Sequence, residues 1–253
     1  MRRLEDKTAL VTGGAGGIGA ATARLFAEEG CRIALVDWEK DLIEDVATRI
    51  EAEVAGSEIL TIAGDVGKEE TAGKAVATTI AAFGAIDILT NIAGIRSYEP
   101  LAESKAETWD KIIRINLLSY AYFAREALPA LRGSGRGAIV NVSSTHAFNP
   151  RAGMGQYDVT KAGIISMTRT LAFEEAEHGV RVNAVCPGLT LTPFHERRLG
   201  KPGKELLAEK VDVNLLRRWA DPREIAYPIL WLASDEASFV TAETIMVDGG
   251  SRV

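Results

Sequence analysis

Residues 8–27, TALVTGGAGGIGAATARLFA, are typical of a strand, a glycine-rich turn and a helix in immediate succession. The apolar residues 8–11 lead into Thr12 and Gly13, the turn contains Gly17 and Gly19, and small and apolar residues follow at helical spacing. Glycines in such a turn let the backbone approach a pyrophosphate, and the N-terminus of the helix adds free N–H groups and positive potential. The context therefore favours a dinucleotide-binding unit over a plain glycine-rich turn.

A second apolar run, residues 32–37 (RIALVD), ends in Asp37, close to 20 residues after the glycine-rich turn. An acid at that place accepts hydrogen bonds from the ribose hydroxyls of adenosine and repels a 2′-phosphate. Asp37 therefore predicts NAD rather than NADP as the cofactor. An aspartate that only ends a strand or caps a helix is the alternative.

Apolar runs and helical patterns continue to alternate through the rest of the chain. Further strands are expected at 59–63, 86–90, 138–142, 180–185 and 244–247, and helices up to residue 55, at 69–83 and 109–132, from 157 onward and at 223–233. Such alternation predicts an α/β fold, a single-domain Rossmann fold with a doubly wound parallel sheet and helices on both faces. No linker or repeat interrupts residues 1–253, so we expect one domain, with its site at the carboxyl ends of the strands.

Residues 143–161, SSTHAFNPRAGMGQYDVTK, contain Ser144, Tyr157 and Lys161. Tyr157 and Lys161 are four residues apart and share one face of a helix. An ammonium beside a phenol favours the phenolate, which can exchange a proton with an alcohol or a carbonyl at cellular pH. Ser144 follows an apolar strand and can hold the same substrate oxygen. Tyr-x-x-x-Lys alone is a weak signal, because a packed tyrosine followed by a solvated lysine is common.

Together, these motifs resemble those of the short-chain dehydrogenase/reductase family over nearly the whole chain. The matching positions are Thr12, Gly13, Gly17 and Gly19 in the glycine motif, Asp65-Val66 near the adenine, Asn91-Ile92-Ala93-Gly94, Asn116, Ser144, Tyr157 and Lys161, Pro187-Gly188 with Thr192, and Val247-Asp248-Gly249-Gly250. Thirteen residues separate the serine from the tyrosine, as in the family. Ile92 stands where the family has a second asparagine, at a position with a structural role.

The resemblance implies a role for each matched residue. Tyr157 is implied as the acid/base, Lys161 as the residue that favours its ionised form and holds the nicotinamide ribose, Ser144 as the residue that orients the substrate carbonyl, and Asn116 as the anchor of a water in a proton relay. The cofactor-binding residues implied are Thr12, Gly13, Gly17, Ile18, Gly19, Asp37, Asp65, Val66, Asn91, Ala93, Gly94, Tyr157, Lys161, Pro187, Gly188, Thr190 and Thr192. A substrate lid is implied at about 189–216, and a homotetramer or homodimer is expected.

The function predicted in this way is that of an NAD(H)-dependent oxidoreductase that interconverts a secondary alcohol and a ketone on a small polar substrate. A 3-oxoacyl thioester reductase that uses NADPH is one alternative; Asp37, and Ala15 and Gly16 where that branch has a basic residue, count against it. A non-catalytic, dinucleotide-sensing regulator on the same fold is another. All four catalytic positions are retained, which a regulator does not require.

Basic residues occur in three segments that border the substrate pocket in this family. They are Arg96, His146, Arg151 and His195, with Arg197 and Arg198 following. Each alone is typical of a solvated surface side chain. Together, in a chain of net charge −6, they suggest a substrate that carries a carboxylate or many hydroxyls, such as a sugar acid or a hydroxy acid.

Composition excludes several other classes of protein. The net charge of −6 argues against binding to nucleic acid or to an anionic membrane. Cys31 and Cys186 have no metal-binding spacing and are expected to be reduced thiols of a cytoplasmic protein. Residues 1–14 lack the apolar segment of a signal peptide, and no apolar run is long enough for a transmembrane helix.

Overall fold

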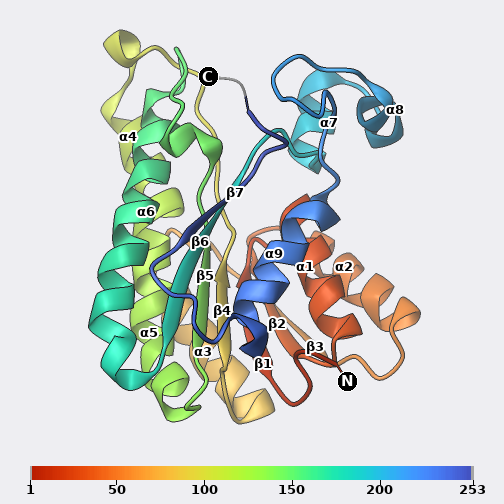
Figure 1. Ribbon diagram of the computed structural model, residues 1–253, viewed down its shortest axis with the longest axis vertical. Helices are drawn as coiled ribbons and strands as arrows, with labels where there is room; N and C mark the ends of the chain where they lie inside the picture. The colour runs from red at the N-terminus through yellow and green to blue at the C-terminus, as the bar shows by residue number, and fades with distance from the viewer. Residues whose placement is uncertain (1, 252–253) are drawn as a thin grey trace.

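Seven parallel strands form one sheet in the computed structural model, which describes residues 2–251 (Figure 1). The strands are β1 (Thr8–Thr12), β2 (Arg32–Asp37), β3 (Ile59–Ala63), β4 (Ile88–Asn91), β5 (Ala138–Val142), β6 (Arg181–Pro187) and β7 (Thr244–Val247). Their order is β3-β2-β1-β4-β5-β6-β7. The first three strands are therefore added towards one edge of the sheet and the last four towards the other, with the change between β1 and β4. Every residue of β1, β4 and β5 is buried, because helices cover both faces of the sheet. The predicted doubly wound Rossmann fold is confirmed.

Helices cover the two faces in two groups (Figure 1). The first group is α1 (Gly17–Glu28), α2 (Lys40–Glu53) and α9 (Pro222–Ala233), and the second is α3 (Glu69–Phe83), α5 (Ser119–Gly133) and α6 (Gly155–Glu175). Phe26 of α1 and Leu230 of α9 belong to one buried cluster, and Phe123 and Leu131 of α5 belong to the other. The short 3-10 turns are η1 (Leu101–Glu103), η3 (Thr145–Ala147), η4 (Ala176–His178) and η5 (Asp235–Ala237).

The continuous helix expected at 109–132 is interrupted in the structure. It starts earlier, as α4 (Ala106–Ile113), passes through a π-helical turn (Arg114–Leu118) and continues as α5. Asn116 lies in the π-turn and bonds to the backbone of Ile95 in both directions, with its Oδ1 accepting and its Nδ2 donating at 2.8 Å each. A π-turn inserts extra backbone into a helix and often occurs at functional sites. This tertiary contact, which helical periodicity does not encode, accompanies the interruption.

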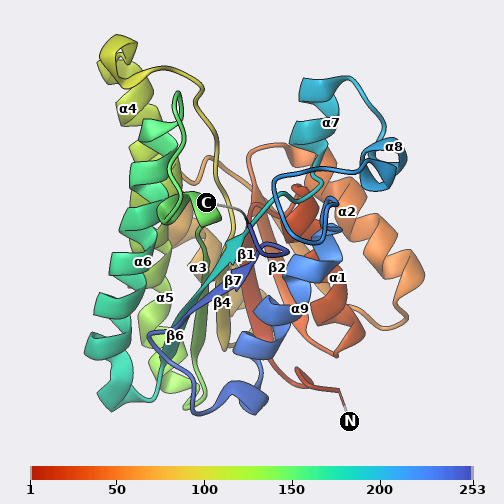
Figure 2. The same ribbon diagram turned by 45° about the horizontal axis from the view of Figure 1, so that its top comes forward.

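Two short helices, α7 (Pro193–Leu199) and α8 (Gly203–Ala208), stand above the carboxyl ends of the strands (Figure 2). They lie within residues 189–216, the segment expected to form a lid. Two backbone hydrogen bonds of 2.9 Å connect this segment to Ala220. The N–H of Leu191 donates to the carbonyl oxygen of Ala220, and the N–H of Ala220 donates to that of Leu189. The base of the segment is thus fixed to the chain that leads into α9.

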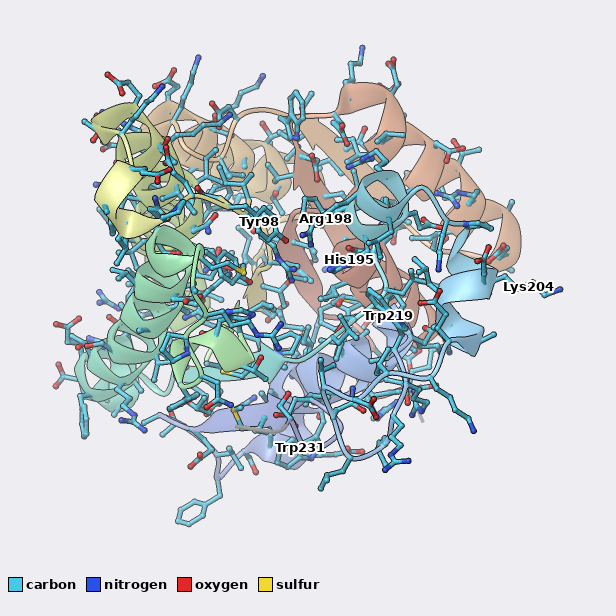
Figure 3. All side chains as sticks on the ribbon, turned by 90° about the horizontal axis from the view of Figure 1, so that it is seen from above. Tyr98, His195, Arg198, Lys204, Trp219 and Trp231 are labelled. Atoms are coloured by element: carbon cyan, nitrogen blue, oxygen red, sulfur yellow. The ribbon has the colours of Figure 1, made fainter. Side chains whose placement is uncertain are left out.

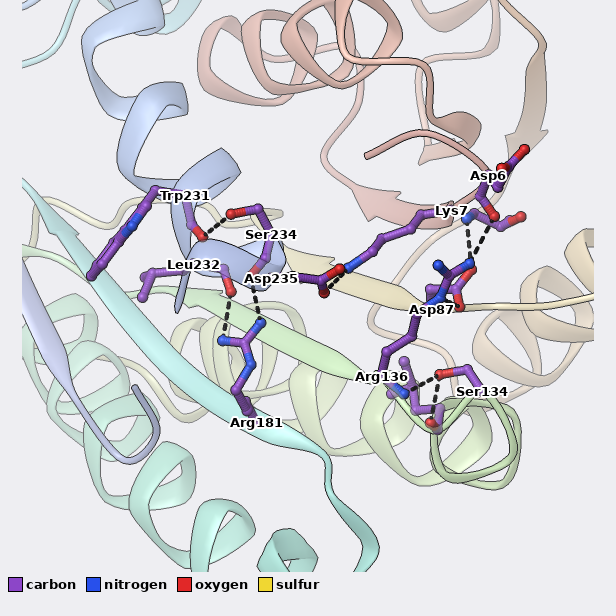
Figure 4. A network of polar contacts seen from close by, with 12 residues as sticks. Asp6, Lys7, Asp87, Ser134, Arg136, Arg181, Trp231, Leu232, Ser234 and Asp235 are labelled. Atoms are coloured by element: carbon purple, nitrogen blue, oxygen red, sulfur yellow. Dashed lines mark hydrogen bonds and ion pairs between the residues drawn. The ribbon is translucent and has the colours of Figure 1, made fainter. Parts of the chain in front are cut away.

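The amino ends of the strands carry a polar network on the opposite edge of the sheet (Figure 4). Lys7 is 2% exposed and its Nζ lies 2.5 Å from Oδ1 of Asp235. Arg136 donates to Asp87 at 3.1 Å, and Arg181 donates to the carbonyl oxygens that end α9. These contacts join the starts of the strands to η5 and lie on the far edge from the residues predicted to act in catalysis.

Within residues 2–251, no helix has the length and apolar character that a membrane crossing requires.

Candidate active site

The glycine-rich turn closes tightly onto the start of α1. A Cβ atom on Gly19 would lie 2.0 Å from the carbonyl oxygen of Gly13, and Gly13 itself has φ of +74°, so both positions require glycine. The first turn of α1 contains no acidic residue, and no side chain caps its N-terminus. Its N–H groups are therefore available to an anion, which fits the pyrophosphate of a dinucleotide.

Thr12 acts beneath this turn. Its Oγ1 accepts hydrogen bonds from the backbone N–H groups of Ile92 at 3.0 Å and Ala93 at 3.3 Å. The hydroxyl thus ties the end of β1 to the loop after β4 and does not line the cleft described below.

Asp37 ends β2 beside the glycine-rich turn and is 8% exposed. Its Oδ2 accepts from the backbone N–H of Ala15 at 3.0 Å, and its Oδ1 accepts from that of Glu39 at 3.2 Å. Backbone contacts therefore fix the carboxylate, and Glu39 adds a second acid to the same part of the cleft. This end of the cleft is negatively charged.

A cleft of about 740 Å³ runs along the carboxyl ends of the strands, from Asp37 to Tyr157. Most of the predicted residues line it: Gly13, Gly17, Ile18, Gly19, Asp37, Asp65, Val66, Ala93, Gly94, Arg96, Ser144, Tyr157, Lys161, Pro187, Gly188, Thr190, Thr192 and His195. The predicted residues outside its lining are Thr12, Asn91, Asn116, His146 and Arg151. Volume, shape and lining together fit an extended dinucleotide with a small substrate at one end.

Ser144, Tyr157 and Lys161 meet on one wall of the cleft and are each less than a tenth exposed. The Nζ of Lys161 lies 5.6 Å from the ring centroid of Tyr157 and donates to the carbonyl oxygen of Val142 at 2.9 Å. Burial, with a smaller effect of the Arg96 charge, lowers the pKa of Lys161 to about 7. The lysine can therefore gain or lose its proton near neutral pH.

Hydrogen bonds anchor α6, which carries Tyr157 and Lys161, to the strand edge. Ser143 donates from its Oγ to the carbonyl oxygen of Lys161 at 2.7 Å, and Ser144 Oγ accepts from the backbone N–H of His146 at 3.2 Å. Both serines directly follow β5, so the end of this strand sets the position of Ser144 relative to α6.

Asn116 lies behind this wall and is fully buried. Besides its two bonds to Ile95, its Nδ2 lies 3.3 Å from Oγ1 of Thr160, which donates to the carbonyl oxygen of Tyr157 at 2.7 Å. A Cβ atom on Gly94 would lie 3.4 Å from Asn116 Oδ1 and 3.5 Å from Lys161 Nζ, so this glycine leaves the space beside both groups free.

Asn91 belongs to a buried chain of polar side chains. It donates to Asn141 on β5 at 2.9 Å, and Asn141 donates to Thr168 on α6 at 3.0 Å. Asn91 therefore connects β4, β5 and α6, and it does not line the cleft.

The four basic residues proposed to meet the substrate differ in position. Arg96 and His195 line the cleft. His146 is held by Asp158, whose Oδ1 lies 2.9 Å from its Nδ1, and burial lowers the pKa of His146 despite that carboxylate. The side chain of Arg151 is exposed. Two of the three basic segments therefore meet at the cleft, through Arg96 and His195, whereas His146 and Arg151 of the third segment do not line it.

The lid segment is joined to the loop after β4 by aromatic rings and arginines. The Arg198 guanidinium lies 4.2 Å from the ring centroid of Tyr98, and the rings of Tyr98 and Phe194 stack at 6.4 Å. His195 packs edge-on against Trp219 at 5.1 Å. Figure 3 shows Tyr98, Arg198, His195 and Trp219 beside one another in the middle of the carboxyl edge. These contacts hold α7 over the substrate end of the cleft.

Two further residues support the site and were not identified from the sequence. Tyr120 is 1% exposed, donates to the carbonyl oxygen of Val142 at 2.9 Å and places its ring centroid 5.6 Å from Lys161 Nζ. Asp158 binds His146 and, at 2.9 Å, the backbone N–H of Arg151, so it fixes the loop before α6. An acid in the first turn of a helix is a recognisable capping signal, whereas nothing in the sequence distinguishes Tyr120.

Comparisons with known proteins show which family the chain resembles over almost its whole length. Residues 13–252 match a family model described as enoyl-(acyl carrier protein) reductase. The short chain dehydrogenase/reductase astE of Aspergillus oryzae is 37% identical over 249 residues, covering 98% of this chain and 95% of the relative. A 2,5-dichloro-2,5-cyclohexadiene-1,4-diol dehydrogenase of Sphingobium indicum is 36% identical and covers 99% and 98%. The crystal structure of levodione reductase superposes with a TM-score of 0.91 at 32% identity, covering 98% of each chain.

Proposed function

The chain belongs to the short-chain dehydrogenase/reductase family, and on that basis we propose that it interconverts a secondary alcohol and a ketone on a small polar substrate, with NAD as its cofactor. The substrate is of the sugar, sugar acid or hydroxy acid type. The proposal rests on one observation: Ser144, Tyr157 and Lys161 line the same cleft as Asp37. Acid/base chemistry and an adenosine-binding carboxylate are thus available to one bound dinucleotide.

In the direction of oxidation, Tyr157 takes the proton of the substrate hydroxyl onto its phenolate oxygen. Ser144 donates a hydrogen bond to that same substrate oxygen and orients it. The side chain of Lys161 lies 5.6 Å from the ring centroid of Tyr157, and its hydrogen bond to the carbonyl oxygen of Val142 fixes its direction. A bound nicotinamide would supply the acceptor for the hydride of the carbinol carbon. Reduction of a ketone reverses these steps, with Tyr157 as the acid.

We propose that Asn116 completes the proton relay by anchoring a water beside Lys161. The free space next to Gly94, bordered by Asn116 and Lys161, supports this role. The hydrogen bonds of Asn116 to Ile95 and Thr160 keep the π-turn, the loop after β4 and the first turn of α6 in register.

The preference for NAD is supported by the charges at the adenosine end of the cleft. Asp37 and Glu39 line it, and the neighbouring lining residues Trp38 and Leu42 carry no positive charge. A 2′-phosphate would therefore meet the carboxylates of Asp37 and Glu39, whereas ribose hydroxyls can donate to Asp37.

One alternative is reduction of a 3-oxoacyl thioester, because a 3-oxoacyl-[acyl-carrier-protein] reductase of Thermotoga maritima is 37% identical over 248 residues. NADPH-dependent turnover of acetoacetyl-coenzyme A faster than of any polyol, hydroxy acid or sugar would favour that alternative.

The experiment that tests the main proposal is a panel of sugars, sugar acids, hydroxy acids and cyclic diols, with NAD and NADP in parallel and NADH absorbance as the readout. Tyr157→Phe serves as the inactive control. Tight NADH binding without turnover of any substrate would instead indicate a dinucleotide-sensing regulator.

We also propose that residues 189–216 act as a lid and that the protein forms a homotetramer or a homodimer. Apolar side chains are exposed on two separate faces, with Phe173 81% exposed on α6 and Met246 41% exposed on β7. Such faces are typical of contacts between subunits. Sedimentation equilibrium of wild type and of Phe173→Ser tests the assembly.

A cytoplasmic location is proposed from the two free thiols, Cys31 and Cys186.

A further inference from the structure

Arg96 lies between two aromatic rings at the substrate end of the cleft. Its guanidinium carbon is 5.4 Å from the ring centroid of Tyr157 and 5.5 Å from that of Phe194. One ring belongs to the proposed acid/base and the other to α7 of the lid segment. The guanidinium is therefore next to the position where the substrate would react.

No carboxylate neutralises this guanidinium among residues 2–251. The acids that line the cleft, Asp37, Glu39 and Asp65, follow β2 and β3, away from Tyr157. Asp158, which follows Tyr157 on α6, is already bound to His146. Burial opposes the charge of Arg96, but the neighbouring Tyr157 and Tyr98 outweigh this effect and raise the pKa of the guanidinium. None of these neighbours is a carboxylate, so an anionic ligand would add the counter-charge that the described residues do not supply.

A second basic side chain lies at this end of the cleft. Lys161 is 5.6 Å from the ring centroid of Tyr157 and lines the cleft together with Arg96. The acids that line the cleft lie at the ends of β2 and β3 instead. A substrate anion beside Tyr157 would therefore meet basic side chains and none of these acids.

His195 fixes the orientation of Arg96. Its Nε2 lies 3.2 Å from a terminal nitrogen of Arg96, and its Nδ1 lies 2.9 Å from Oγ1 of Thr192. A guanidinium can only donate, so Nε2 must accept and Nδ1 must carry the proton that it donates to Thr192. Burial, together with the charges of Arg96 and Arg198, lowers the pKa of His195 to about 4 and keeps it neutral. One guanidinium N–H is thereby used, and the others have no carboxylate partner.

We infer that Arg96 binds a carboxylate of the substrate, which makes the substrate a hydroxy acid or a sugar acid whose carboxylate is within a few bonds of the reacting carbon. This inference rests on the proposed function for the reacting alcohol and adds the acidic group. A guanidinium and a carboxylate form paired, charge-assisted hydrogen bonds. His195 serves as a positioning residue that presents the guanidinium to this group.

The kinetic test uses matched pairs of an acid and a neutral analogue: 3-hydroxybutyrate with 2-butanol, D-gluconate with D-glucitol, and glycerate with glycerol. In the pair that reacts best, wild type should favour the acid. Arg96→Gln should raise KM for the acid by about ten- to a hundred-fold and change KM for the neutral analogue much less. Arg96→Lys should recover part of the loss. Arg169→Gln, an exposed arginine on α6, is the control for a change of net charge.

His195→Phe tests the positioning role. It removes the acceptor for Arg96, so KM for the acid should rise by a larger factor than KM for the neutral analogue. A uniform fall in kcat on both substrates would instead show that His195 supports only the lid and would remove the positioning role.

A binding measurement separates failure of this inference from failure of the proposed function. Malonate is titrated into the protein with NADH bound, and its dissociation constant is measured by calorimetry. Weaker binding to Arg96→Gln by about ten-fold or more supports the anion site even if no alcohol is oxidised. If neutral alcohols are oxidised while malonate binds both proteins equally, the anion site is refuted and the proposed function remains. Equal kinetics on acid and neutral analogue in wild type would also refute it.

Discussion

Lys161 donates a hydrogen bond of 2.9 Å to the carbonyl oxygen of Val142, the last residue of β5. The lysine is 3% exposed, and this carbonyl is its only hydrogen-bond partner among the described residues. The bond fixes the direction of the side chain but supplies no negative charge. A fully charged ammonium is therefore costly here, which is why burial lowers the pKa of Lys161 to about 7.

Replacing Lys161 with methionine should stabilise the cofactor-free protein in a pH-dependent way. The folded-state pKa of about 7 is below the ordinary 10.5, so between these values the unfolded chain holds a proton that the folded chain releases. Stability of wild type therefore rises with pH across this window, and the cost of the ammonium is greatest at or below pH 7. Lys161→Met should gain on the order of a few kcal/mol near pH 7, reduced by about 1 kcal/mol for the lost hydrogen bond. The gain should shrink towards pH 10.

Urea unfolding at pH 6, 7, 8 and 9 measures this difference. Lys204→Met, at an exposed position on α8, is the control. A difference between Lys161→Met and wild type that does not change with pH would contradict the assignment of the shift to Lys161.

Tyr157→Phe should lower kcat by about 10²–10⁴-fold, the usual contribution of a positioned general acid or base to the rate. NADH affinity should stay nearly unchanged. The ring and its packing against His146 at 5.7 Å are retained, and only the hydroxyl is lost. Steady-state kinetics and NADH fluorescence titration provide the two readings. If more than about a tenth of wild-type kcat remains, another group transfers the proton.

Asp37→Asn should relax the preference for NAD over NADP. The asparagine oxygen can still accept a backbone hydrogen bond such as that from Ala15, while the charge that repels a 2′-phosphate is removed. The ratio of kcat/KM for NADP to that for NAD should rise on the order of ten-fold, equivalent to ~1.4 kcal/mol. Glu51→Gln, an exposed acid on α2, is the matched control. An unchanged ratio, or faster turnover of NADP by wild type, would show that Asp37 does not select the cofactor.

Gly19→Ala should weaken both the fold and dinucleotide binding, whereas Gly16→Ala should be tolerated much better. A Cβ atom on Gly19 would lie 2.0 Å from the carbonyl oxygen of Gly13, but one on Gly16 would lie 3.3 Å from the same oxygen. The backbone must therefore move to accommodate alanine at position 19, whereas a slight shift is enough at position 16. Thermal unfolding should show a loss of several degrees or more for Gly19→Ala, in line with ~1–3 kcal/mol for overpacking. Equal midpoints and equal NADH affinities for the two variants would contradict this account of the turn.

Most of the fold follows from local pattern. The strand expected at 138–142 and that at 59–63 agree with β5 and β3 to the residue, because short apolar runs between turn signals have few alternatives. The strand expected at 86–90 is shifted, since β4 spans Ile88–Asn91. Its end depends on pairing with β1 and β5, where Asn91 lies opposite Thr12 and Asn141.

The sequence by itself determined the alternation of strands and helices, the position of the glycine-rich turn and the spacing of Ser144, Tyr157 and Lys161, because these depend on residues close together in the chain. Only the tertiary structure decided which of the basic residues line the cleft. Arg96 and His195 come from segments 99 residues apart and meet at 3.2 Å, whereas Asp158 holds His146 and solvent surrounds Arg151. The charge and spacing of residues in a sequence do not predict which partner contacts a basic side chain, because burial and contacts between distant residues determine the partner.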